Sequence, residues 1–234
     1  SANMVEFFQP YQWVIDALRE GPTATGEPVS MAGYGNTPLA SLIAHSIQAM
    51  AAAVFGDQAA LERHTAEALP LLAAAPGNYP SAVARVLRGL ALAGQIRATD
   101  GDARNTLLVE LDEVTRWLAV RAADAPQNFL HLLRLLEAER AWAVGDFQGC
   151  VRGFDAALHG AGQRPRPWHR ALITERAARF YLAHGLDHNG YELLTQTRQQ
   201  YAAWGATAKV AQLDWAYPSL PPHQDTSAAQ RNTG

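Results

Sequence analysis

The stretch that decides the fold runs from residue 138 to residue 157 and reads AERAWAVGDFQGCVRGFDAA. On both sides of Gly145, apolar residues recur every three or four positions, the spacing of one face of a helix. Ala138 lies seven residues before that glycine, and Cys150 and Ala157 lie five and twelve residues after it. Small residues at such places let two helix backbones approach closely. The stretch therefore predicts a helical hairpin.

Turns of the same kind are predicted at Gly56 and Gly185, with a weaker one at Gly94. The intervals are 38, 51 and 40 residues (56 to 94, 94 to 145, 145 to 185), close to the roughly 34 to 47 residues of two-helix solenoid units. Leu61 and Leu87 are the large residues among the equivalent positions. The other equivalent positions are small: Ala49, Ala68, Ala178, Gly190 and Thr197. This pattern resembles a degenerate tetratricopeptide array.

Helical periodicity continues almost without interruption from Pro38 to Tyr217, and β-branched runs are scarce. Breaks at glycine and proline predict helices over residues 38–55, 58–74, 80–97, 103–124, 127–144, 147–161, 168–184, 187–204 and 206–216, and a tenth near 5–20. We therefore expect an all-α fold. Its architecture should be a right-handed solenoid of tetratricopeptide-like helical hairpins, with about nine or ten helices.

Three segments flank the predicted array of residues 37–217. Residues 1–3, before Met4, look like a cloning remnant. Residues 4–36 combine the first helix with a Gly/Pro-rich loop or hinge. Residues 218–234 are polar and rich in proline, so we expect a disordered tail.

The composition argues against several classes of protein. Net charge is −3, and hydrophobic residues make up 48% of the chain, which suits a folded protein without a basic patch for nucleic acid or a membrane surface. Apolar stretches are interrupted before about 20 residues, so no membrane-spanning helix is expected. Cys150 is the only cysteine, which rules out an intrachain disulfide and favours a cytoplasmic setting.

No side-chain pattern predicts a catalytic centre. Of the eight histidines, His184 and His188 have a spacing that could suit a metal, but Gly185 lies between them and should place them on different faces. Cys150 is expected to pack at a hairpin crossing and not to act as a nucleophile. We therefore expect no catalytic residue, no cofactor and no metal.

Other conspicuous side chains have structural interpretations. Asp57, Asp146 and Asp187 each stand at the beginning of a second helix, where a carboxylate can cap free N–H groups. Tryptophans at helical positions are expected to fill gaps between hairpins. These are Trp117, Trp142, Trp168, Trp204 and Trp215.

One set of positions suggests a contact surface for a partner. If the first helix of each hairpin lines the concave face, the residue six before each turn glycine points into it: Met50, Arg88, Glu139 and Arg179. The three charged residues alternate in sign, as a groove that binds a charged peptide would require. Alternatively, they pair with one another between stacked helices. Both interpretations stay open.

Three stretches extend the resemblance to a particular family. The first is APQNFLH (125–131) with EAERA (137–141); the second is FDAAL (154–158), WHRAL (168–172) and ERAARFYL (175–182); the third is YAAWGATAKV (201–210). Together they resemble the C-terminal helical region of large bacterial AAA/STAND signalling ATPases. That family includes hybrid kinases and actinobacterial Ser/Thr kinases of the protein kinase K type, and more distantly the maltose-regulator class. The resemblance covers about residues 40–220.

The resemblance implies a regulatory or partner-binding segment attached to an ATPase and often to a kinase. This chain has neither a P-loop nor the kinase motifs. We therefore predict a non-catalytic sensor or docking domain of a signalling kinase or transcription regulator. Its partner would be a protein, a peptide or adjoining modules of the parent chain. A self-association scaffold that forms a homodimer and a helical enzyme with a His-based site are the alternatives.

Overall fold

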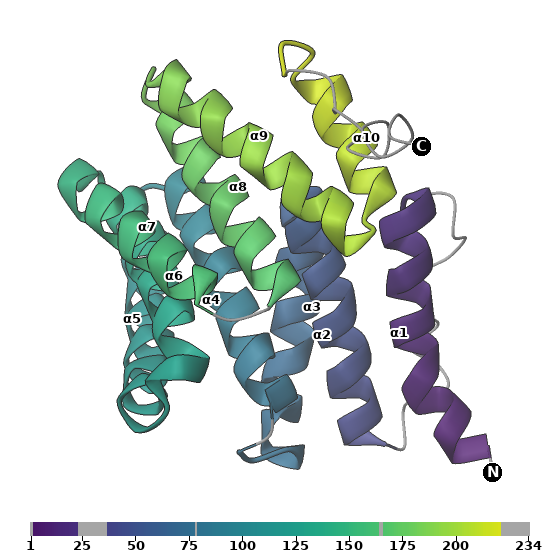
Figure 1. Ribbon diagram of the computed structural model, residues 1–234. Coiled ribbons are helices and arrows are strands. Elements are labelled where there is room, and N and C mark those ends of the chain that lie inside the picture. Colours follow the sequence, from purple (N-terminus) through teal and green to yellow (C-terminus); the bar gives the residue numbers. More distant parts are fainter. Residues whose placement is uncertain (1, 23–36, 78, 164–165, 221–234) are drawn as a thin grey trace, which may run out of the picture.

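A computed structural model describes residues 2–22, 37–77, 79–163 and 166–220, and within these every regular element is a helix (Figure 1). The elements are α1 (Ala2–Glu20), α2 (Pro38–Phe55), α3 (Gln58–Ala68), the 3-10 helix η2 (Leu69–Ala74), α4 (Tyr79–Ala98), α5 (Gly101–Asp124), α6 (Pro126–Val144), α7 (Phe147–Gly162), α8 (Pro167–Ala183), α9 (Asp187–Trp204) and α10 (Thr207–Ala216). The all-α prediction and the number of helices are confirmed. Residues 23–36 of the loop expected over 21–36, and residues 221–234 of the tail expected over 218–234, lie outside the described residues.

Most helix boundaries agree with the predicted ones to within two residues, but the helix predicted over 58–74 is wrong in its second half. The α-helix ends at Ala68 and a 3-10 helix follows, with Pro70 at its beginning. Proline lacks the N–H that an α-helix needs at that position, so the backbone changes its hydrogen-bonding pattern there. At the other end of the chain, α1 starts at Ala2, earlier than predicted.

Helices pack in sequence as hairpins: α2 with α3, α4 with α5, α6 with α7, and α8 with α9. The small-residue positions lie at the crossings, and Ala138, Cys150 and Ala157 are each at most 1% exposed. In the hairpin of α6 and α7, a Cβ on Gly153 would come within 2.9 Å of the Ala138 Cα. This spacing shows why large side chains are excluded between these two backbones.

The turn predicted at Gly94 is wrong, because that glycine lies inside α4. A Cβ there would come within 2.3 Å of the Gln58 side chain, whose amide donates to the Ala91 carbonyl at 2.9 Å. Gly94 therefore serves close packing and not a turn. The positive-φ glycine that follows α4 is Gly101, the first residue of α5, which makes the intervals 45, 44 and 40 residues (56 to 101, 101 to 145, 145 to 185).

The first helices of the four hairpins, α2, α4, α6 and α8, are hereafter the inner helices. Successive inner helices contact one another, which is the arrangement that a solenoid of hairpins requires. The chain also curls back on itself, since α10 contacts both α1 and α2 (Figure 1). One apolar cluster joins these ends through Val14, Ile47, Ala178, Tyr201 and Leu213. The helix predicted to stand before the array thus packs against it.

In the part of the chain that the structure describes, one helix, α2, is long and apolar enough to cross a membrane by length and composition alone. Most of it is buried inside the fold, against α1, α3 and α4. A core helix of a soluble protein has the same properties. We therefore treat α2 as a core helix.

Candidate functional site

The four residues predicted for the concave face have four different environments. Met50 is partly buried between two apolar clusters. Arg88 forms a two-pronged ion pair with Glu110 of α5, at 2.7 and 2.8 Å. Glu139 is completely buried, and Arg179 donates to Glu175 one helical turn earlier at 2.5 Å. Arg88 pairs with none of the other three. Its position was derived from a turn at Gly94, and that glycine lies inside α4.

Glu139 joins two inner helices to its own. Its carboxylate accepts from Arg97 of α4 at 2.9 Å and from Arg176 of α8. Burial would raise the pKa of this carboxyl, but the guanidiniums of Arg176 and Arg97 outweigh burial and hold it below its usual value. Arg97 also lies over the Trp142 ring, 4.4 Å from its centroid. The carboxylate is therefore ionised and its two guanidinium partners are fixed in place.

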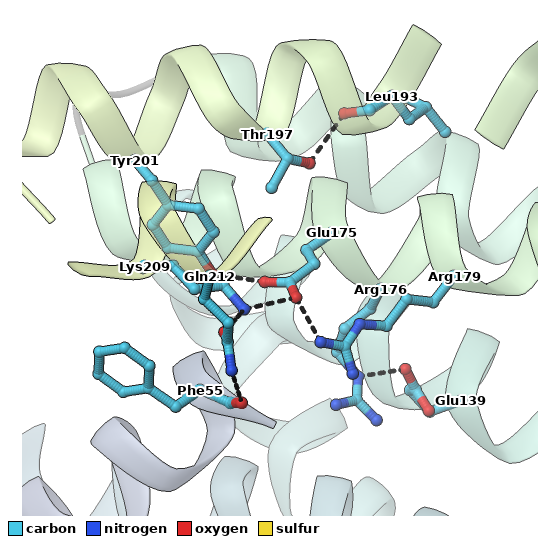
Figure 2. A network of polar contacts seen from close by, with 10 residues as sticks. All are labelled: Phe55, Glu139, Glu175, Arg176, Arg179, Leu193, Thr197, Tyr201, Lys209 and Gln212. Atoms are coloured by element: carbon cyan, nitrogen blue, oxygen red, sulfur yellow. Dashed lines mark hydrogen bonds and ion pairs between the residues drawn. The ribbon is translucent and has the colours of Figure 1, made fainter. Parts of the chain in front are cut away.

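Glu175 forms a second centre, next to the first (Figure 2). Besides Arg179, it accepts from the Tyr201 hydroxyl at 2.9 Å and from the Lys209 ammonium at 2.8 Å. The side chain of Lys209 is 0% exposed. Burial works against ionisation of Glu175, yet Lys209 and Arg179 bring its pKa below the ordinary value. Buried charges of this kind are tolerated only when they are paired and hydrogen-bonded.

The second centre ties the last helix to the first hairpin. Lys209 also donates to the Gln212 side chain at 2.9 Å, and Gln212 donates to the Phe55 carbonyl at the end of α2 at 3.0 Å (Figure 2). We call the two centres together the arginine–carboxylate network: Arg97, Glu139, Glu175, Arg176, Arg179, Tyr201 and Lys209. It joins α4, α6, α8, α9 and α10.

The network lies where the inner helices end. A cavity of about 180 Å³ there is lined by Gly56 of α2, Arg97 of α4, Trp142 of α6, and Arg176 and Arg179 of α8. The last turn of a helix carries partial negative charge, which favours Arg97 at the end of α4, whereas Arg176 and Arg179 stand earlier in α8 and depend on the carboxylates. Gly56 has a φ of +78°, a conformation that strains any residue with a side chain, and a Cβ there would also come 3.2 Å from the Arg179 guanidinium.

The predicted caps and the cysteine can be checked directly. Asp57 and Asp146 accept from the N–H groups of Ala60 and Gly149, each at 2.9 Å, as predicted. For Asp187 the prediction is wrong: it is the first residue of α9, after the N-cap Leu186, and makes no capping bond. Its carboxylate in the first turn still favours the helix electrostatically.

Cys150 is buried at the hairpin crossing, as predicted. Burial, then the charges of Asp146 and Glu139, raises the pKa of its thiol to about 12. The thiol is thus protonated at neutral pH and is a poor nucleophile.

Four of the eight histidines form two close pairs that the sequence did not indicate. His45 Nδ1 lies 3.2 Å from His64 Nδ1, and His131 Nε2 lies 2.8 Å from His169 Nδ1. His184 and His188 lie on either side of the turn between α8 and α9, as expected. Among the described residues, no three His, Cys, Asp or Glu side chains gather in a way that could hold a metal.

Sequence reasoning found Glu139 and Arg179 but missed their partners. Glu175 and Arg176 lie in the second family-like stretch, and Lys209 lies in the third. The stretches thus include residues of the buried ion pairs, whose role in this fold is structural. Nothing in the sequence indicates Arg97, because its partner lies 42 positions away.

Comparisons with protein-family models, with curated proteins and with solved structures find no match to this chain.

Proposed function

We propose that this chain is a non-catalytic docking or sensor domain that binds a protein, a peptide or adjoining modules of its parent chain. The parent would be a cytoplasmic, ATPase-linked signalling kinase or transcription regulator, as the family-like stretches imply. The supporting observation is that the buried charges are committed to partners inside the fold. Glu139, Glu175 and Lys209 each have at least two such partners. Acid–base or nucleophilic catalysis needs a group that can exchange a proton or electron pair with a bound molecule.

Such a domain acts through its shape. Each hairpin buries its faces on its neighbours, and a partner bound across several hairpins biases the way that the attached modules are arranged. The proposal is tested by displaying random peptides and selecting against the purified chain. We expect a recurring sequence that binds with one-to-one stoichiometry, and no hydrolysis of ATP or of peptides by the same preparation. Failure to enrich any sequence, or reproducible hydrolysis, would contradict the proposal.

A self-association scaffold is the second candidate, because apolar side chains are exposed on the two helices that meet at the chain ends. Phe8, Tyr11 and Ile15 on α1 are 64%, 44% and 41% exposed, and Trp215 on α10 is 85% exposed. The expectation that Trp215 fills a gap between hairpins is thus wrong, since no later helix in the described chain covers it.

Light scattering over a concentration series separates the two candidates. A docking domain stays monomeric without its partner. A scaffold forms dimers, and Trp215→Ser combined with Tyr11→Ser would abolish them.

A further inference from the structure

At the end of the molecule where α4, α6 and α8 begin, three arginines gather around a cleft of about 560 Å³. Tyr79 of α4, Trp117 and Arg121 of α5, Phe129 of α6 and Arg166, directly before α8, line it. Arg85 of α4 adds a third guanidinium, since both Arg85 and Arg121 lie over the Trp117 ring, at 4.3 and 4.1 Å from its centroid. We call this place the arginine cleft, defined by Tyr79, Arg85, Trp117, Arg121, Phe129 and Arg166.

None of these three arginines forms an ion pair with a carboxylate of the described residues, in a chain whose net charge is −3. Arg85 and Arg121 each donate only to a carbonyl of their own helix, both at 3.3 Å. Arg166 donates to the Asn128 side chain at 2.6 Å. Burial, and then the neighbouring charge of Arg121, lowers the pKa of Arg85. Arg85 and Arg121 are therefore close enough to repel one another.

The helix ends add to this positive field. The N-caps of α6 and α8 are Ala125 and Arg166, and neither supplies a side-chain capping bond. The first N–H groups of a helix carry partial positive charge and bind anions when no side chain occupies them. Guanidiniums that form no ion pair in the described structure, two helix N-termini and a lining without Asp or Glu all favour an anionic ligand at the same cleft.

A second, apolar pocket shares Tyr79 with the arginine cleft. Its volume is about 170 Å³, enough for one large side chain, and it is lined by Ile43, Ile47 and Met50 of α2, Val83 of α4 and Trp168 of α8, among others. Met50 is one of the residues predicted to contact a partner. A ligand that extends from one site into the other thus meets positive charge first and an apolar pocket next.

We propose that this face binds an acidic peptide that carries one bulky apolar residue. Carboxylates of the peptide pair with Arg121 and Arg166, and the apolar side chain enters the pocket beside Met50. A nucleotide fits less well, because the polar groups of the lining are already engaged: Asn128 with Arg166, and the Tyr79 hydroxyl with His169 at 3.1 Å. Few groups are left to read the edge of a base. This inference rests on the proposed function and names the chemistry of its partner.

The test uses a fluorescein-labelled peptide in which one phenylalanine is flanked on each side by three glutamates, and fluorescence anisotropy with the whole chain. Binding should weaken by about tenfold to a hundredfold in the double variant Arg121→Gln, Arg166→Gln, because each of the two charge-assisted pairs is worth up to about a factor of ten. Replacing the phenylalanine of the peptide by serine should weaken binding to the wild type by a similar factor.

The matched control is Arg134→Gln with Arg140→Gln, which removes the same charge from two arginines that already pair with Glu137 and Asp112. It should bind within about threefold of the wild type. Circular dichroism checks that each variant is folded, and Arg121→Lys with Arg166→Lys keeps the charge if the Gln variants do not fold. Affinity between that of the wild type and a tenfold loss is expected for the Lys variants, since Lys lacks the two-pronged geometry.

The inference would be overturned if the control Arg134→Gln, Arg140→Gln weakened peptide binding as much as Arg121→Gln, Arg166→Gln. Binding of the acidic peptide would then depend on the net charge of the protein alone. Absence of binding to the acidic peptide, or binding of ATP that is lost in the Arg121→Gln, Arg166→Gln variant, would also overturn it. Peptides selected from the random library distinguish this failure from that of the proposed function. If they bind that variant as tightly as the wild type, the arginine cleft is not the site but the docking function stands.

Discussion

Three arginines lie toward each end of the stack of helices, and only those at one end are paired with carboxylates. At the C-terminal ends, Arg97, Arg176 and Arg179 pair with the buried carboxylates of Glu139 and Glu175. In the arginine cleft, no carboxylate of the described chain pairs with the three guanidiniums, and two of them lie near the beginning of a helix.

The difference separates a structural role from a binding role for the same side chain. An arginine with a buried carboxylate partner contributes to folding and has little left to offer a ligand. An arginine among like charges, near helix N-termini, gains its counterion only when a ligand supplies one. Variants at the first end should therefore change stability, and variants at the second end should change binding.

The largest effect is expected for Glu139→Gln. It leaves Arg97 and Arg176 without a charged partner inside the fold, which should lower the free energy of unfolding by about 3 kcal/mol. Urea unfolding followed by circular dichroism measures this. Glu110→Gln is the control, because Glu110 is 32% exposed where it pairs with Arg88, and its loss should cost under about 1 kcal/mol. Equal costs for the two variants would mean that the buried network is not special.

Lys209→Met should destabilise the chain by about 2 kcal/mol, less than Glu139→Gln, because Glu175 keeps Arg179 and Tyr201 as partners. The double variant with Glu175→Gln should lose less than the sum of the two single losses, since the residues are coupled. Unfolding midpoints of the two single variants and the double variant measure the coupling. Strict additivity would show that Lys209 and Glu175 act independently.

Acid should destabilise the chain in the range between neutral pH and pH 5. Burial, followed by the charges of neighbouring groups, lowers the pKa of His131 to about 4 and that of His169 to about 3, from 6.5. The unfolded chain therefore binds more protons than the native chain below pH 6.5, and stability falls as pH falls. Each histidine contributes on the order of 2 kcal/mol between pH 7 and pH 5. His169→Gln should flatten the pH dependence of the unfolding midpoint, and an unchanged slope would contradict the assignment.

The smallest effect is expected in the arginine cleft. Arg85→Gln loses the contact with Trp117 but relieves repulsion from Arg121, so the free energy of unfolding should change by less than about 1 kcal/mol. Thermal unfolding at low and high salt separates the lost contact with Trp117 from the relieved repulsion, because salt screens only the repulsion. Arg176→Gln, at the other end, should instead cost about 2 kcal/mol, because the buried Glu139 keeps only Arg97 as a partner. A loss as large in Arg85→Gln would show that the cleft arginines are structural.

Much of the fold could be predicted from the sequence, because its signals are local. The periodicity and the glycine turns at Gly56, Gly145 and Gly185 gave nearly every helix. The prediction of a turn at Gly94 was wrong because this glycine leaves room for the Gln58 side chain. The sequence does not distinguish a glycine needed for close packing from one needed for a turn. The end of the α-helix near Pro70 was also predictable from the sequence, because proline lacks the N–H that an α-helix needs at that position.

The charge pairing could not be predicted, because it depends on contacts between distant segments. Spacing within a hairpin placed Glu139 on the inner face, but its partners come from α4 and α8, 42 and 37 positions away. The arginine cleft likewise assembles from three helices and the residue before a fourth, and it leaves no pattern along the chain. The net charge of −3 even led us to expect no basic patch on the surface.

The most direct test of the difference between the two ends is the NMR spectrum of the arginine side chains, recorded as Nε–H signals while the acidic peptide is added. We predict that the signals of Arg85, Arg121 and Arg166 shift in a saturable way while those of Arg97, Arg176 and Arg179 stay where they are. Saturable shifts at Arg97, Arg176 or Arg179, or no shift at Arg121 and Arg166, would contradict the account.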